Sequence, residues 1–130
     1  MKLKMGSSLH LKRDYINRST KRKGKGMRKI KVIIKRPDEE YGHVSWISDT
    51  LSNLQKTVEG YIETFTVSED VVIICNEEGL IKQLPFNCRL CEQDFFGTII
   101  VAGVNGDEFD SIPENLTMPV FKQLYLGSID

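Results

Sequence analysis

The apolar run VVIIC at residues 71–75 limits the possible fold more than any other stretch of this sequence. A run of β-branched side chains and a thiol, with no polar residue between them, predicts a strand that is buried on both faces. The segment NEEG at residues 76–79 then predicts a turn that returns to solvent. A second apolar run, IIVA at residues 99–102, predicts a neighbouring strand in the centre of the same sheet.

The segments before the central strand predict a hairpin, a short helix and a further strand. Residues 30–35 alternate in polarity, as do residues 43–48, so we expect the two to pair across the turn at residues 38–42. Asp49 is the expected N-cap of a helix of about ten residues, and Gly60 is its expected left-handed C′ residue. The apolar residues of this helix, Leu51, Leu54 and Val58, recur at helical spacing. A strand at residues 61–67 is expected to follow the helix.

The later segments have fewer signals. Residues 80–94 lack a clear period, which predicts a long loop. Residues 111–114 have the spacing of a capping box, and Pro119 is expected to interrupt this region. A helical stripe then predicts a C-terminal helix, formed by Val120, Phe121, Leu124 and Tyr125. The expected fold is therefore α+β, a mainly antiparallel sheet of about five strands with one helix between strands two and three and a C-terminal helix.

The formal net charge of zero conceals two parts of opposite sign. Residues 1–29 hold eleven Lys or Arg and one acid, whereas residues 30–130 hold seven Lys or Arg and seventeen Asp or Glu. We therefore divide the chain into a flexible basic N-terminal arm, residues 1–28, and a compact acidic domain, residues 29–130. Charge asymmetry of this size concerns the partners of a protein more than its fold.

Cations of the arm are the predicted nucleic-acid contacts, because lysine and arginine neutralise phosphates whatever the base sequence. The alternatives are a solubilising tail and an arm that folds back on its own acidic domain. The predicted contact residues are Lys12, Arg13, Arg18, Lys21, Arg22, Lys23, Lys25, Arg28 and Lys29.

The three cysteines argue against a disulfide framework and for a reducing intracellular compartment, because their number is odd. Cys88 and Cys91 have the spacing of two zinc ligands, and Cys75 with His43 would complete four. A second close pair is missing, however, and a thiol inside a core strand usually packs as a small apolar side chain. We therefore expect no metal and no other cofactor.

The remaining candidate site is a small-molecule pocket around the loop at residues 80–94. Its expected contacts are Asn76, Lys82, Asn87 and Arg89. Carboxylate pairs beside turns leave a metal-dependent enzyme as a remote alternative. The sequence contains no nucleophile elbow, no phosphate-binding glycine loop and no histidine placed as a base, so we expect a protein that is not an enzyme.

Five spaced motifs also carry a family resemblance. They are IKVII at 30–34, DTL at 49–51 leading to VEGYIE at 58–63, VIICNEEG at 72–79, LPFN at 84–87 and GTIIVAG at 97–103. Together they resemble a family of small domains of unknown function that is common in bacteriophages and mobile elements of bacteria. The resemblance covers about residues 29–112. It supplies no catalytic residue, and it implies a phage accessory protein, a class that frequently counters host defence.

Charge and resemblance together predict a non-enzymatic anti-defence protein in the cytoplasm of a bacterial host cell. It would inhibit a host nucleoprotein, such as a CRISPR effector, through the basic arm and the acidic domain, as some anti-CRISPR proteins with basic arms do. No membrane partner is expected, because no run approaches 18 apolar residues. The alternatives are a sponge that sequesters a nucleotide immune signal and the metal-dependent enzyme.

Overall fold

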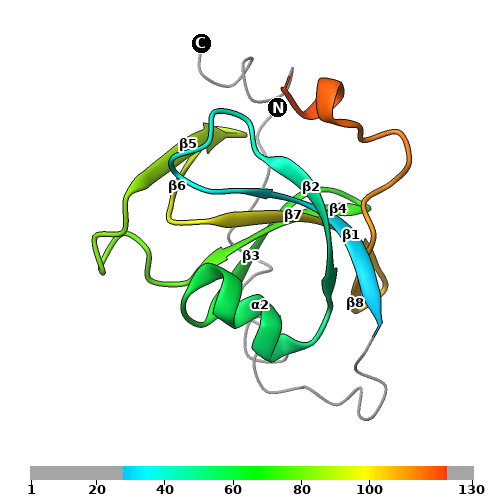
Figure 1. Cartoon of the computed structure of the whole chain (residues 1–130), viewed down its shortest axis with the longest axis horizontal. Coiled ribbons are helices and arrows are strands. Elements are labelled where there is room, and N and C mark those ends of the chain that lie inside the picture. The colour runs from blue at the N-terminus through cyan, green and yellow to red at the C-terminus, as the bar shows by residue number, and fades with distance from the viewer. Residues whose placement is uncertain (1–27, 123–130) are drawn as a thin grey trace.

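The computed structural model describes residues 28–122, which form an α+β domain around a mainly antiparallel sheet (Figure 1). The expected class is confirmed, but the sheet has more strands than the five expected. Its central path is β2–β1–β7–β4–β3, and β8 pairs with β7 beyond the end of the β1 contact. The bounds are β1 (Lys29–Lys35), β2 (His43–Ser48), β3 (Ile62–Ser68), β4 (Val71–Asn76), β7 (Ile99–Asn105) and β8 (Glu108–Asp110).

The two apolar runs lie side by side in the centre of the sheet, as the sequence predicts. All six residues of β4 are buried. It pairs in antiparallel register with β7, so that Ile73 faces Val101 and Ile74 faces Ile100. Because β4 has neighbouring strands on both edges and apolar layers on both faces, a polar side chain at residues 71–75 would lie among apolar side chains, which explains the uninterrupted apolar run.

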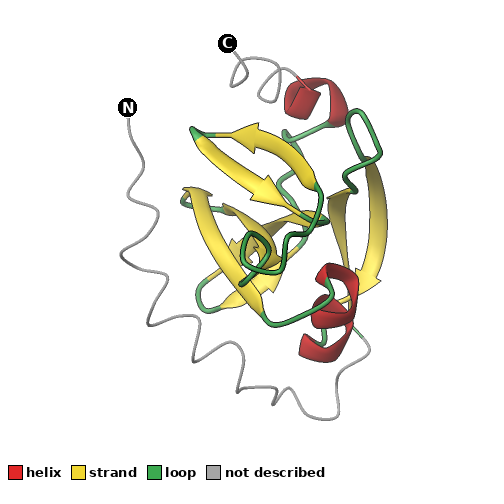
Figure 2. Ribbon diagram, turned by 90° about the vertical axis from the view of Figure 1, so that its left-hand side faces the viewer, coloured by secondary structure: helices red, strands yellow, loops and turns green. Residues whose placement is uncertain are grey.

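Each face of the sheet has its own apolar layer. The helix α2 (Leu51–Val58) covers one face, where Leu54 and Val58 pack with Ile74 and Ile100. The second sheet, β5 (Phe86–Leu90) with β6 (Gln93–Phe96), covers the other face together with residues 112–121. Figure 1 shows α2 and the β5–β6 hairpin on opposite sides of the main sheet, and Figure 2 shows the same arrangement from the side.

The ends of α2 differ from the expected ones by one residue each. The N-cap is Thr50, whose Oγ1 accepts a hydrogen bond from the backbone N–H of Asn53 at 3.3 Å. Asp49 instead pairs with the guanidinium of Arg28, with Nε and Oδ2 3.4 Å apart. At the C-terminal end the left-handed residue is Glu59, with φ 64°, and not Gly60.

The second half of the chain holds the larger corrections. Residues 80–94 are not a long loop, because they contain β5 and the start of β6. Residues 111–114 do not begin a helix: the Ser111 hydroxyl accepts a hydrogen bond from the backbone N–H of Lys31 and fastens this segment to β1. Helical residues start at position 118, so Pro119 lies in a first turn and does not interrupt the region. Leu124 and Tyr125 lie outside the described residues.

Within residues 28–122, no helix combines the length and the apolar character needed to cross a bilayer.

Candidate binding sites

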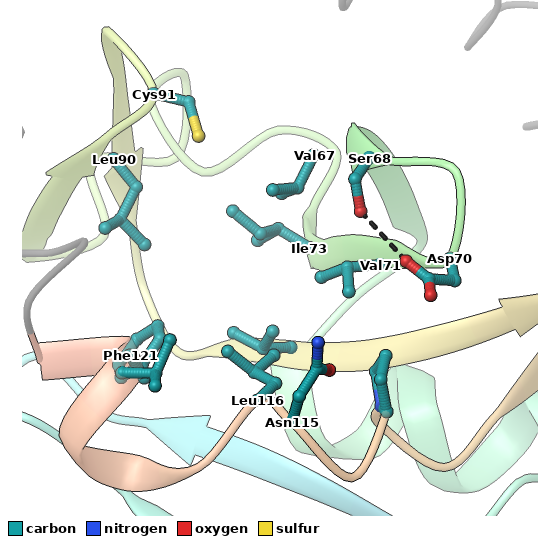
Figure 3. Close-up of a pocket in the computed structure, with 13 residues that line it drawn as sticks. Val67, Ser68, Asp70, Val71, Ile73, Leu90, Cys91, Asn115, Leu116 and Phe121 are labelled. Atoms are coloured by element: carbon teal, nitrogen blue, oxygen red, sulfur yellow. Dashed lines mark hydrogen bonds between the residues drawn. The ribbon is translucent and has the colours of Figure 1, made fainter.

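An apolar cavity of about 450 Å³ lies between the β3–β4 turn, the end of β5 and residues 113–121 (Figure 3). Leu90, Ile73, Leu116 and Phe121 surround the open space in the figure. The polar groups at its edge include Ser68, whose hydroxyl donates to Asp70 at 3.1 Å. A cavity of this size and lining suits an apolar ligand or an apolar side chain of another segment.

A second cavity, which we call the acidic groove, has a volume of about 570 Å³ and lies between the β5–β6 hairpin and the adjoining ends of β3 and β4. Its polar rim carries four carboxylates and one guanidinium, for a formal charge of −3 at neutral pH. These residues are Glu63, Glu77, Glu92, Asp94 and Arg89. Arg89 is paired with Asp94 across the hairpin at 3.0 Å. The groove therefore repels anions and attracts cations.

Aromatic side chains form much of the rest of the acidic groove. Phe65, Phe95 and Phe96 line it together with Leu80. Phe65 and Phe95 pack edge to face, with ring centroids 5.3 Å apart. A ligand for this groove therefore needs positive charge and apolar surface on the same molecule.

Asn76 and Asn87, two of the predicted pocket residues, are buried and bonded to the protein itself. The Asn76 amide donates to the carbonyl oxygens of Val58 and Glu59 at 3.0 and 3.1 Å, and its Oδ1 accepts from the N–H of Glu78 at 2.7 Å. Since both donors of the Asn76 amide are in use, this side chain holds the end of α2 against β4.

Asn87 joins three segments in the same way. Its amide donates to the carbonyl oxygens of Lys35 and Gly97 at 2.8 Å each, and its Oδ1 accepts from the Lys35 ammonium at 2.8 Å. This arrangement ties β5 to the end of β1 and to the turn before β7. Asn87 therefore has a structural role in this fold.

The four predicted pocket residues do not converge on one cavity. Asn76 and Arg89 line the acidic groove, whereas Lys82 and Asn87 do not. Lys82 lies 3.8 Å from the carboxylate of Glu78, its neighbour four residues earlier. Two of the four predicted contacts therefore line the acidic groove, whose negative charge the sequence analysis did not predict.

Only the last two of the predicted nucleic-acid contacts, Arg28 and Lys29, lie within the described residues. Arg28 donates to the carbonyl oxygen of Phe109 and to Asp110, both at 3.0 Å, and also faces Asp49. Lys29 is exposed. The remaining contacts lie outside the described residues: Lys12, Arg13, Arg18, Lys21, Arg22, Lys23 and Lys25.

The cysteines behave as core residues or as turn residues. Cys75 and Cys88 are buried, and burial raises the pKa of both thiols, that of Cys88 to about 11. Burial also raises the pKa of the half-buried Cys91. His43, the fourth residue of the zinc site that the sequence analysis considered and did not favour, faces Glu39, with Nδ1 and Oε2 2.8 Å apart. In the described part of the chain, no three or more His, Cys, Asp or Glu side chains come together as a metal site.

Lys35 is a buried cation whose structural role the sequence analysis did not predict. It is 1% exposed, although it lies at the end of a strand beside Arg36 and Pro37. Its ammonium donates to the carbonyl oxygen of Glu39 at 2.7 Å, besides its bond to Asn87. Since Asn87 is 52 residues away in the chain, no local pattern marks the pair.

Comparisons with other proteins place the chain in a family. Neither functionally curated proteins nor experimentally solved structures gave a significant match. Residues 30–125, which span the strands and the helix described above, match the Domain of unknown function (DUF3846), and the chain therefore belongs to the DUF3846 family.

Proposed function

We propose that this protein acts by binding, with its acidic domain on a basic protein surface and the residues before Arg28 on nucleic acid. The observation that carries the proposal is the division of charge. Residues 1–27 hold nine Lys or Arg and one acid, whereas residues 28–122 hold nine Lys or Arg and sixteen Asp or Glu. A partner that presents both signs of charge, as a nucleoprotein does, complements such a molecule.

The cations of the domain support this assignment of roles, because several are already engaged with the domain's own oxygen atoms. Arg28 bonds to Asp110, Lys82 faces Glu78, Arg89 pairs with Asp94, and Lys35 is buried against Asn87. A cation that must leave a carboxylate to reach a phosphate gains less from the exchange. Nucleic-acid contact therefore falls to residues 1–27.

As the partner we propose a host nucleoprotein, and a CRISPR effector is the example that the resemblance to phage-associated domains implies. The acidic domain would occupy the positively charged channel of the effector, and the residues before Arg28 would bind the nucleic acid within that channel. Together these contacts would inhibit the effector. The nucleotide sponge has weaker support, because the acidic groove would set four carboxylates against the phosphates of a nucleotide.

The test measures the affinity for short RNA and DNA by fluorescence anisotropy over a series of salt concentrations. A variant of the full chain with Lys21→Gln, Arg22→Gln, Lys23→Gln and Lys25→Gln is compared with the wild type. For every phosphate that the variant no longer neutralises, the slope of log affinity against log salt should fall by about 0.7 on single strands and about 0.9 on duplex DNA. Lys56→Gln with Lys82→Gln is the control for lysines of the domain. Equal affinities of the arm variant and the wild type at every salt concentration would rule out the nucleic-acid role.

A further inference from the structure

We infer that the acidic groove and the apolar patch beside it form a docking surface for the chain's own N-terminal segment, residues 1–20. The patch consists of Leu80, Ile81 and Phe86, which are 68, 78 and 54% exposed, respectively. Exposed apolar side chains that are grouped in this way mark interaction surfaces. The docking itself does not depend on nucleic-acid binding, but its consequence for affinity rests on the proposed function.

The patch and the groove share a wall. Phe86 packs edge-on against Phe96, with ring centroids 5.6 Å apart, and both Phe96 and Leu80 line the groove. The chain also passes close to Phe96 at Gly79, where a Cβ atom would lie 2.7 Å from the Phe96 carbonyl oxygen. Leu80 and Phe86 therefore both adjoin the acidic groove, so that exposed apolar side chains lie next to a formal charge of −3.

Residues 1–20 have the complementary chemistry. They contain five Lys or Arg and one acid, Asp14. Apolar residues are interspersed among these cations: Leu3, Met5, Leu9, Leu11, Tyr15 and Ile16. By contrast, residues 21–26 are KRKGKG and offer charge without an apolar side chain. Residues 1–20 therefore fit a surface that is both acidic and apolar, and residues 21–26 do not.

The length of chain before β1 also favours residues 1–20, and not residues 21–26, as the segment that docks. Strand β4 runs in the direction of β1, because both are antiparallel to β7, so the groove at the end of β4 lies near the end of β1. The seven residues of β1 span about 23 Å from Arg28 to that end. Residues 21–27, when extended, cover about the same distance, which leaves residues 1–20 to occupy the surface.

Docking would make the domain a competitor of nucleic acid for the same segment. A covalent connection of this length gives a local concentration on the order of 1 mM, so a weak contact is sufficient at low salt. A nucleoprotein partner that offers phosphates to the segment and basic residues to the groove would displace the contact at both ends. The protein would thus expose its basic segment mainly when such a partner is present.

The test is limited trypsin proteolysis of the full chain, with the cleavage products identified by mass spectrometry. The measured quantity is the cleavage rate after Lys12, Arg13 and Arg18 divided by the rate after Lys21 to Lys25, so that effects of salt on the protease cancel. At about 20 mM salt this ratio should be roughly five- to tenfold lower than at about 500 mM, where the charges are screened. Glu77→Gln with Glu92→Gln should raise the low-salt ratio to the high-salt value.

Two further variants complete the test. Glu69→Gln with Asp107→Asn removes the same charge from exposed sites outside the groove and should leave the ratio at the wild-type value. Leu9→Ser with Leu11→Ser leaves the domain untouched and should remove the protection. If all variants share one ratio at low salt, the docking is refuted. Protection that disappears on dilution would also overturn the proposal, because it would place the segment on a second copy.

Nucleic-acid affinity separates this inference from the proposed function. If both are right, the groove variant binds RNA severalfold more tightly than the wild type at low salt. A second outcome would support the docking and overturn the proposed function. In that outcome, protection from trypsin depends on the groove, but the arm variant binds nucleic acid as tightly as the wild type.

Discussion

Lys35 and Asn87 bind each other twice inside the domain. The Lys35 ammonium donates to Asn87 Oδ1, and the Asn87 amide donates to the Lys35 carbonyl oxygen, each at 2.8 Å. The two residues are 1 and 6% exposed. Because β5 otherwise pairs only with β6 among the described strands, this reciprocal bond is a main attachment of the hairpin to the central sheet.

Asn87→Ala should therefore be among the most damaging substitutions in the domain. It removes an acceptor from a buried ammonium and a donor from two buried carbonyl groups, which should lower the free energy of unfolding by about 3–4 kcal/mol. Lys35→Met removes the charge itself and should cost less, about 1–2 kcal/mol. Urea denaturation measures both, with exposed Asn115→Ala as the control. An unchanged midpoint for Asn87→Ala would show that the pair does not hold the hairpin.

Two substitutions at the C-terminal end of α2, one that introduces a glycine and one that removes a glycine, should change the free energy of unfolding in opposite directions. Glu59→Gly should raise the free energy of unfolding by about 0.5–1 kcal/mol, because Glu59 has a left-handed backbone that glycine adopts without a Cβ clash. Gly60→Ala should lower it by about 1–3 kcal/mol, since its Cβ would lie 2.6 Å from Asn76 Nδ2 and break that side chain's bonds. Thermal unfolding of both variants checks the pair, and effects of the same sign would contradict it.

Gly60 also shows where sequence reasoning stops. A glycine after a helical stripe usually marks the left-handed position, but here the glycine makes room for Asn76, which is 16 residues further along the chain. The glutamate before it adopts the left-handed conformation instead. The helix itself was predictable because its apolar period is local, whereas the identity of its cap residues depended on a long-range contact.

The β5–β6 hairpin escaped prediction for a related reason. Its two turn residues, Cys91 and Glu92, both have positive φ, 52 and 64°, the geometry that Asn-Gly normally marks in a sequence. Neither residue carries that signal, and the two strands are short. The central strands, by contrast, were predictable because burial on both faces leaves an uninterrupted apolar run. The negative charge of the groove depends on how the hairpin packs, so it could not be predicted before the hairpin itself.

The buried thiols predict a loss of stability at alkaline pH. The pKa of Cys88 is raised from 9.0 to about 11 by burial, so its contribution is fully present below pH 9 and is lost as the pH rises toward 11. At pH 10 this thiol should have removed roughly 1 kcal/mol from the free energy of unfolding. Cys88→Ala should therefore lose less stability than the wild type between pH 8 and about 10. Urea denaturation at both pH values measures the difference, and parallel losses would exclude a buried thiol at this position.

Phe121 should anchor residues 118–122 over the sheet. It is 2% exposed and belongs to the apolar layer that also contains Ile73 and Val101. Phe121→Ala should enlarge the apolar cavity and lower the free energy of unfolding by about 3–4 kcal/mol. Val120→Ala is the matched control, because Val120 is 43% exposed and its loss should cost at most about 0.5 kcal/mol. Equal costs for the two variants would mean that this segment does not pack as described.

Arg28 and Lys29 are adjacent cations that should behave differently. Arg28 already bonds to Asp110 and to the Phe109 carbonyl oxygen, and it faces Asp49, whose side chain is 4% exposed. Arg28→Gln should therefore lower the free energy of unfolding by about 1–2 kcal/mol and leave the salt slope of DNA binding unchanged. Lys29→Gln should change neither the stability nor the slope measurably, because Lys29 is exposed and lies after the residues that we propose to contact nucleic acid. Urea denaturation and a salt series on both variants separate the roles. A reduced slope for Arg28→Gln would show that this guanidinium leaves its carboxylates to bind phosphate, and would move the start of the nucleic-acid interface into the folded domain.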